Sequence, residues 1–92
     1  MKILYTQQAI HDLQRLRDFI AFDNTKAAFN ASERLRHAIK QLIDFPTLGK
    51  LIKNESKSLS VRDLFTGKYL IRYALLANEI HILRIWHTRE HR

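Results

Sequence analysis

The chain has 92 residues, of which 46% are hydrophobic and 27% are charged, and its 16 Lys and Arg against nine Asp and Glu give a formal net charge of +7. This length leaves room for one hydrophobic core, so we expect a single domain over residues 1–92, and the composition argues against a disordered, collagen-like or coiled-coil chain. Because cysteine is absent, disulfides and thiolate-held zinc are excluded.

The positive charge is concentrated in residues 50–92, which carry nine basic against four acidic side chains. We expect an anionic partner there, either a phosphate backbone or an acidic protein segment, although solubility alone is a plainer role for the charge. Residues 2–8 lack the apolar stretch of a signal peptide, and no apolar run approaches the ~20 residues of a membrane span. We therefore expect a cytoplasmic protein without a membrane partner.

The N-terminal part is predicted to begin with a short strand and a helix. Residues 2–5 form a short apolar run, and Thr6 can cap the next helix by accepting from its first backbone N–H groups. Over residues 7–22, apolar side chains recur at steps of three and four, which is typical of an amphipathic helix. They are Ala9, Leu13, Leu16 and Ile20.

A second helix is expected almost directly after the first. Residues 23–25 are all of capping type, and Pro46 disfavours helical backbone at the residue before it, so this helix should end by Phe45. Because the connection is so short, the two helices must form an antiparallel hairpin. The apolar period of the second helix runs through Ala28, Ala31, Leu35, Ile39 and Leu42.

The C-terminal half is predicted to be a loop followed by three strands. Residues 47–58 are mostly polar with little periodicity, and we expect a loop there. Strands are expected from Leu59, over residues 68–76 and over residues 79–86, with a turn at Thr66-Gly67. The predicted fold is therefore α+β, with a short N-terminal strand and a two-helix hairpin packed on a C-terminal antiparallel sheet.

The last predicted strand is apolar at both side-chain parities, as in a strand covered on both faces, but Arg84 interrupts the pattern. Arg84 shares its parity with Ile82 and Trp86, where an unpaired guanidinium would be costly to bury. It must therefore form an ion pair with one of the nine carboxylates or face a polar concavity. The first alternative is structural and the second is functional.

The element order and several short motifs resemble the ParE/RelE superfamily of type II toxins. The likeness extends over nearly the whole chain, and its most specific part is the closing strand. The segments that carry it are Asp12-Leu13, Ala27-Ala28, Pro46 with Gly49, Arg62, Tyr69, Tyr73 and the final Leu83-Arg84-Ile85-Trp86-His87-Thr88-Arg89.

This resemblance implies a growth-inhibiting toxin that is neutralised by an acidic antitoxin wrapped around it, so that the two form a hetero-oligomer. The antitoxin would lie over the helix hairpin and the sheet, consistent with an apolar and basic surface that seeks an acidic amphipathic partner. The candidate antitoxin contacts are Leu13, Leu16, Ile20 and Leu35.

The superfamily divides between two activities, and the fold alone does not choose between them. The RelE-like branch cleaves mRNA on the ribosome, whereas the ParE-like branch poisons DNA gyrase. The closing strand is more similar to the ParE-like branch, although its second arginine stands only two residues after His87, which leaves that arginine's role open. We expect a gyrase-directed toxin, with the target contacts Lys68, Arg84, Arg89 and Arg92.

A ribosome-dependent mRNA endonuclease is the alternative. Attack by a 2′-hydroxyl needs a proton acceptor, a proton donor and cations beside the phosphorus. His87 would serve as acid or base, with Arg84, Arg62 and Arg89 as charge stabilisers and Tyr73 or Lys68 as a supporting group, although a strand-end histidine is more often a surface residue.

Such an enzyme would act without a metal ion, and no cofactor is expected. His81 and His87 are the nearest candidate ligands on one strand, but six extended residues separate them by ~20 Å, which is too far to share one ion.

A general nucleic-acid-binding module is a second alternative. It would use the same basic half, and Tyr69, Tyr73 and Trp86 could stack on bases, although at alternating strand positions aromatic side chains are more often part of the core. Salt-dependent binding to any nucleic acid would favour this alternative, and growth arrest without the antitoxin would favour a toxin.

Overall fold

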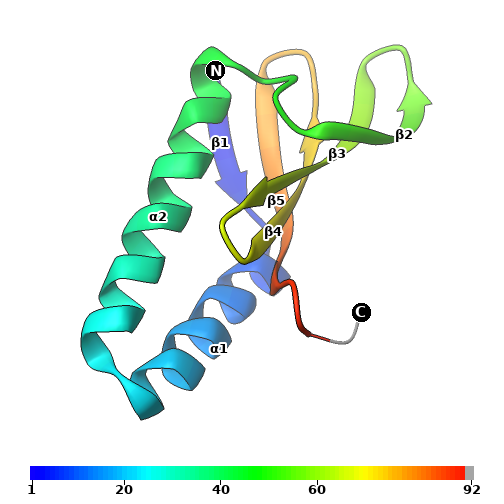
Figure 1. Cartoon of the computed structure of the whole chain (residues 1–92). Helices are drawn as coiled ribbons and strands as arrows, with labels where there is room; N and C mark the ends of the chain where they lie inside the picture. Colours follow the sequence, from blue (N-terminus) through cyan, green and yellow to red (C-terminus); the bar gives the residue numbers. More distant parts are fainter. Residues whose placement is uncertain (91–92) are drawn as a thin grey trace.

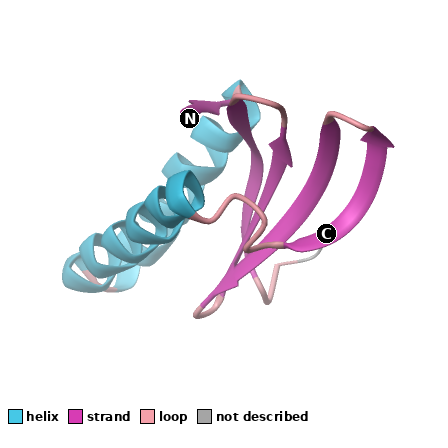
Figure 2. Ribbon diagram, turned by 90° about the horizontal axis from the view of Figure 1, so that it is seen from above, coloured by secondary structure: helices cyan, strands magenta, loops and turns pink. Residues whose placement is uncertain are grey.

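The computed structural model describes residues 1–90, with the backbone alone at residues 22 and 23. Two helices lie together on one side of a curved sheet (Figures 1 and 2). Over the described residues, neither helix has the length and apolar character needed to cross a membrane. In chain order the elements are β1 (Lys2–Tyr5), α1 (Gln7–Asp23), α2 (Thr25–Asp44), β2 (Lys50–Ser56), β3 (Leu59–Thr66), β4 (Tyr69–Leu75) and β5 (Glu79–His87).

The five strands form one sheet in the order β1-β5-β4-β3-β2. The C-terminal strands β2 to β5 pair with one another in antiparallel fashion, and β1 pairs with β5 in parallel. The predicted α+β fold is therefore confirmed, with one parallel pair added to the expected antiparallel sheet.

The expectation of a loop over residues 47–58 is wrong, because Lys50–Ser56 forms the edge strand β2. All seven residues are exposed, and two register shifts interrupt the pairing with β3. A strand with neither face buried needs no alternation of polar and apolar residues, so its sequence carries no period of two. Lysines and bulges are common at such edges, where they limit pairing with other chains.

The helix caps follow the sequence expectations. The hydroxyl of Thr6 accepts from the backbone N–H of Ala9 at 3.1 Å, and the side chain of Asn24 accepts from the backbone N–H of Ala27 at 3.0 Å. The second helix ends at Asp44, two residues before Pro46. These caps satisfy donors that a helix start otherwise leaves unpaired.

The core lies between the helices and the sheet. Leu16, Leu35 and Leu42 from the helices are at most 4% exposed, and they pack with a row of fully buried side chains from the sheet. That row contains Ile71, Tyr73, Ile80, Ile82 and Ile85.

A bulge in β5 changes which of its side chains face the core. Tyr73 pairs with Ile82 but Arg72 pairs with Arg84, so Leu83 is the extra residue. Ile82 and Ile85 are therefore both fully buried although they differ in parity, and the expectation that one parity continues through the strand is wrong.

The opposite face of the sheet is covered by its own side chains. The guanidinium groups of Arg72 and Arg84 lie 5.1 and 4.9 Å from the ring centre of Trp86. Arg72 also forms a two-bond ion pair with Asp63, with distances of 2.8 and 2.9 Å. These arginine stems and the indole shield apolar surface that no helix covers, and Leu70 beneath them is 1% exposed.

Candidate functional site

The first candidate, Tyr73, is part of the core. Its hydroxyl donates to the carbonyl of Pro46 at 2.7 Å and accepts from the N–H of Gly49 at 2.9 Å. A Cβ at Gly49 would lie 2.7 Å from a ring carbon of Tyr73, so only glycine allows this approach. Burial raises the pKa of Tyr73, while the Gly49 bond and the charge of Arg62 oppose that shift. With its hydroxyl fully engaged, Tyr73 holds the α2–β2 connection on the sheet.

Arg62 belongs to the same connection. Its Nη1 donates to the carbonyl of Gly49 at 3.0 Å, and its buried Nε has no hydrogen-bond partner among the residues that the structure describes. No carboxylate within residues 1–90 forms an ion pair with it. Arg62 therefore keeps an uncompensated charge. It lies beside Tyr73 at the α2–β2 connection, away from His87.

Arg84 forms an ion pair with a carboxylate, which is one of the two alternatives that the sequence allowed. Its Nε donates to Oδ2 of Asp12 at 2.8 Å and its Nη2 to Oδ1 at 3.2 Å, and its side chain is 36% exposed. Asp12 itself is fully buried on α1. The ion-pair alternative for Arg84 is therefore the one that the structure contains.

Asp12 is the charged centre of this end of the fold. It also accepts from the backbone N–H of Ile85 at 2.9 Å and from the side chains of Arg15 and Gln8. Burial by itself raises the pKa of Asp12, but these bonds and the one from Arg84 outweigh burial and lower that pKa from 3.8 to about 2. Asp12 is thus ionised across the physiological range.

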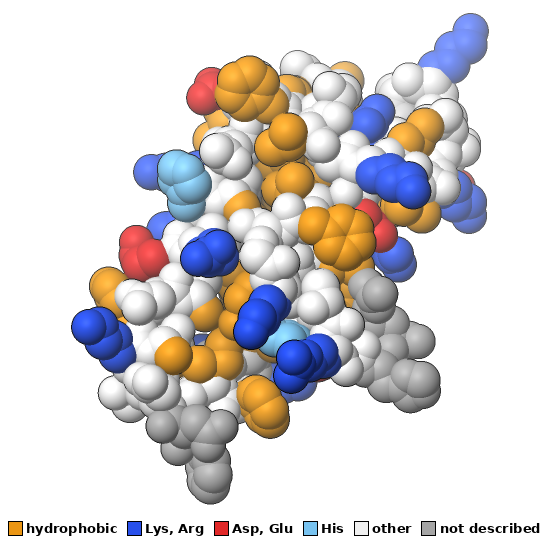
Figure 3. Space-filling view, viewed as in Figure 1, with side chains coloured by type: hydrophobic (Ala, Val, Ile, Leu, Met, Phe, Trp, Pro, Cys, Tyr) orange, Lys and Arg blue, Asp and Glu red, His pale blue; other side chains and the backbone are white. Residues whose placement is uncertain are grey.

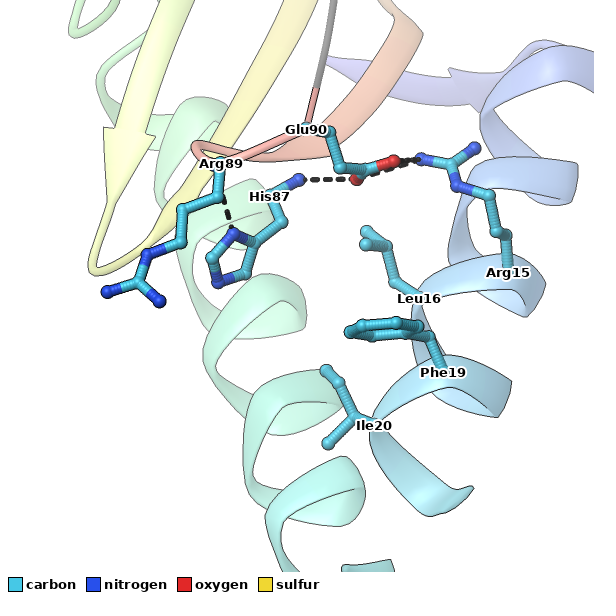
Figure 4. A pocket seen from close by; sticks show the side chains of 7 residues that line it. All are labelled: Arg15, Leu16, Phe19, Ile20, His87, Arg89 and Glu90. Atoms are coloured by element: carbon cyan, nitrogen blue, oxygen red, sulfur yellow. Dashed lines mark hydrogen bonds and ion pairs between the residues drawn. The ribbon is translucent and has the colours of Figure 1, made fainter. Parts of the chain in front are cut away.

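His87 lies at the end of β5, next to a pocket of about 360 Å³ (Figure 4). Its ring meets the edge of Tyr69 with centroids 5.4 Å apart, and its Nδ1 accepts from the backbone N–H of Arg89 at 3.1 Å. The proton of the neutral ring is then on Nε2. Glu90 accepts from the backbone N–H of His87 and pairs with Arg15.

Of the six side chains proposed for RNA cleavage, only Lys68 and Arg89 lie close to His87. Arg62 is paired across the sheet with Tyr73, and His87 with Tyr69, so four residues of β4 separate them, about 13 Å at the usual strand rise. Arg84 and His87 differ by three positions in β5, and alternation directs them to opposite faces. Among residues 1–90, no three His, Asp or Glu side chains are placed to hold a metal ion.

Two of the four expected target contacts gather near His87. Lys68 and Arg89 are both exposed, and the carbonyl of Lys68 accepts from the N–H of Thr88 at 2.7 Å, which holds the two segments together. Arg84 lies on the other face in its pair with Asp12. Arg92 is outside the described residues.

The expected antitoxin contacts lie in or against the core. Leu16 and Leu35 are 4% and 3% exposed, and Leu13 and Ile20 are half-buried against the same cluster. These side chains face the sheet, so their contact with an antitoxin stays a prediction that their burial weakens. The periodicity missed Phe19, which lies beside the apolar stripe, is 74% exposed and lines the pocket with Leu16 and Ile20.

Asp12 was also missed, although the sequence contains a signal for it. It stands three residues after Ala9 and four before Leu16, which places it on the buried stripe of α1. A carboxylate on such a stripe needs a cationic partner from another element.

Comparisons with known proteins agree on one family. The family model for the ParE toxin of the type II toxin-antitoxin system parDE matches residues 3–92. Toxin RelE1 of Caulobacter vibrioides is 29% identical over 90 residues, covering 98% of this chain and 96% of that protein. Toxin RelE2 of the same organism is 31% identical over 87 residues, covering 95% and 94%.

A solved structure has the same fold. The chromosomal ParDE TA system from P. aeruginosa contains a chain that matches with a TM-score of 0.73 at 23% identity, and the match covers 95% of each chain. At this identity the likeness concerns the fold alone.

The low pKa of Asp12 predicts a specific acid sensitivity. The unfolded chain binds this proton at higher pH than the folded chain, so the stability from the ionised carboxylate is complete above about pH 4 and is lost between about pH 4 and pH 2. The loss in the free energy of unfolding should be about 2 kcal/mol. Urea titrations at several pH values would measure it.

Asp12→Asn should be less stable at neutral pH, by about 3 kcal/mol, and should not show that acid-dependent loss. Asp18→Asn, at an exposed position of the same helix, is the matched control and should keep the wild-type profile. An unchanged acid profile in Asp12→Asn would contradict the assignment.

Proposed function

This chain belongs to the ParE toxin family of type II toxin-antitoxin systems, and from that premise we propose that it stops bacterial growth by poisoning DNA gyrase. As a toxin of such a system it has an antitoxin as its partner. The choice of target is our inference, and it rests on how the charged residues are distributed.

The observation that carries the proposal is that three of the nuclease candidates, Arg62, Tyr73 and Arg84, do not lie with His87. RNA cleavage needs a proton-transfer group and a phosphate-stabilising cation within hydrogen-bond reach of one reacting centre. Here Tyr73 is buried with its hydroxyl occupied, Arg84 is paired with Asp12, and Arg62 is paired with Tyr73, four β4 residues from the partner of His87. Lys68 and Arg89 lie near His87, but Nδ1 of that ring already accepts from the N–H of Arg89. A toxin that acts by binding needs no such convergence.

The exposed basic end of the molecule supports a binding mechanism. Lys68 and Arg89 flank His87 where β4 begins and β5 ends, and neither forms an ion pair with a carboxylate within residues 1–90. Free cations on one surface increase the rate and specificity of association with an anionic partner. We assign target binding to this end, while Arg84 acts by holding β5 on α1.

The gyrase proposal is tested with purified toxin, gyrase and supercoiled DNA. We expect gyrase-dependent accumulation of cleaved DNA and intact mRNA in translating ribosomes. Arg89→Gln should require about fivefold more toxin for the same cleavage, the effect of losing one charged contact. Arg17→Gln, which removes an exposed arginine from α1, should behave as wild type.

Two outcomes would overturn this target. Cleavage of mRNA in the absence of gyrase would establish the RelE-like alternative. Equal loss in the Arg89→Gln and Arg17→Gln variants would show that general charge, not the basic end, is responsible.

We place part of the antitoxin contact at the pocket beside Phe19. This pocket combines an apolar wall of Leu16, Phe19 and Ile20 with exposed Arg89 at its border, where Arg15 is already paired with Asp12 and Glu90 (Figure 4). An apolar side chain flanked by carboxylates fits it, which is the chemistry of an acidic amphipathic segment.

Phe19→Ala should weaken antitoxin binding by about tenfold or more, as expected for an aromatic interface anchor. Because this ring is largely exposed in the free toxin, its removal should leave thermal stability unchanged. Phe29→Ala, equally exposed on α2 but not part of the pocket, is the control in a calorimetric titration. If both variants bind like wild type, the antitoxin does not use this pocket.

A further inference from the structure

We propose that the pocket between α2 and the β3–β4 turn binds a backbone phosphate of a nucleic acid. The pocket has a volume of about 390 Å³. Its polar groups are Arg34 and Asn30 from α2 and Lys68 and Tyr69 from the turn and β4, and we call it the Arg34–Lys68 pocket. The inference does not depend on gyrase being the target.

Two cations converge in this pocket without a nearby acid. Arg34 and Lys68 are 34 positions apart in the chain, both are exposed, and within residues 1–90 no carboxylate lies within ion-pair distance of either. Like charges in one concavity repel, and the field that they produce concentrates anions there. An anionic ligand would remove this repulsion.

The guanidinium of Arg34 lies against the turn. Gly67 has a φ of +57°, and a Cβ at this residue would lie 3.0 Å from Nη1 of Arg34. The glycine therefore provides both the left-handed turn and the space in which the guanidinium lies. Burial raises the pKa of the Tyr69 phenol, and the charge of Arg34, which also lies near Tyr69, opposes that rise.

The geometry favours phosphate over carboxylate. Arg34 lines the pocket from α2, and Lys68 lines it from the turn before β4. A tetrahedral phosphate offers oxygens to both cations, whereas a planar carboxylate is satisfied by the guanidinium fork alone. The amide of Asn30 supplies a further neutral donor.

The surroundings favour a polymer over a free ion. The carbonyl of Lys68 accepts from the N–H of Thr88, and Tyr69 contacts the ring of His87, so the pocket adjoins the segment that carries Arg89. Lys and Arg side chains continue across this face, separated by hydrophobic ones (Figure 3). Successive phosphates of one strand could be held along such a surface.

The test is a fluorescence-anisotropy titration of the toxin alone with a short DNA duplex of mixed sequence at several salt concentrations. The double variant Arg34→Gln/Lys68→Gln should bind about tenfold more weakly, with a salt slope flatter by about one, as for the loss of one phosphate contact. Arg17→Gln/Lys40→Gln removes the same charge from exposed positions and should keep the wild-type slope.

Three outcomes would overturn the proposal. The same loss in both double variants would mean that diffuse charge binds the DNA. Loss of binding to poly-glutamate with DNA binding intact would identify an acidic protein as the ligand. Pocket-dependent binding of inorganic phosphate without an effect on DNA would identify a small-anion site. Because the assay contains no gyrase, its result is independent of the proposed target, and thermal unfolding confirms that each variant is folded.

Discussion

The arrangement of the whole molecule depends on one buried carboxylate, Asp12, at the place where the sheet would otherwise have an open edge. The parallel pairing of β1 with β5 ends at Ile82, because the chain turns there into α1. Beyond that point no strand within residues 1–90 lies beside the outer backbone groups of β5. Asp12 accepts from the N–H of Ile85, and Glu90 accepts from that of His87. Side chains thus replace a missing strand.

The same carboxylate sets the position of the charged groups on β5. Arg84 follows the bulge at Leu83 and pairs with Asp12, and its guanidinium lies over Trp86, which Arg72 also contacts. One buried anion with two arginines and a backbone donor is a satisfied arrangement, whereas removal of any partner leaves a costly charge. Arg84 is therefore committed to structure, and the cations near His87 remain available for a partner.

The sequence predicted what local patterns determine. Apolar steps of three and four placed both helices, Thr6 and Pro46 marked their limits, and Gly67 marked a turn that requires a positive φ. Sequence analysis failed where a feature depends on pairing with residues elsewhere in the chain. Lys50–Ser56 forms β2 only through pairing with β3, and the bulge at Leu83 exists only in the pairing of β5 with β4.

The candidate site shows the same division. The sequence could name charged and aromatic residues suited to RNA cleavage, but it did not reveal that Arg62 on β3 and His87 on β5 lie opposite different residues of β4, Tyr73 and Tyr69. It also could not show that the Tyr73 hydroxyl would be used by Pro46 and Gly49. The positions of these side chains depend on sheet order and register, which are set by pairing between strands far apart in the sequence.

The central claim is that Asp12 closes the outer edge of β5, and amide hydrogen exchange at Ile85 tests it most directly. If the carboxylate replaces a strand, the Ile85 amide should exchange as slowly as the core amide of Ile71, through global unfolding, and Asp12→Ala should accelerate Ile85 far more than Ile71. Fast exchange of Ile85 in the unmodified protein, at the rate of an open strand edge, would contradict the account.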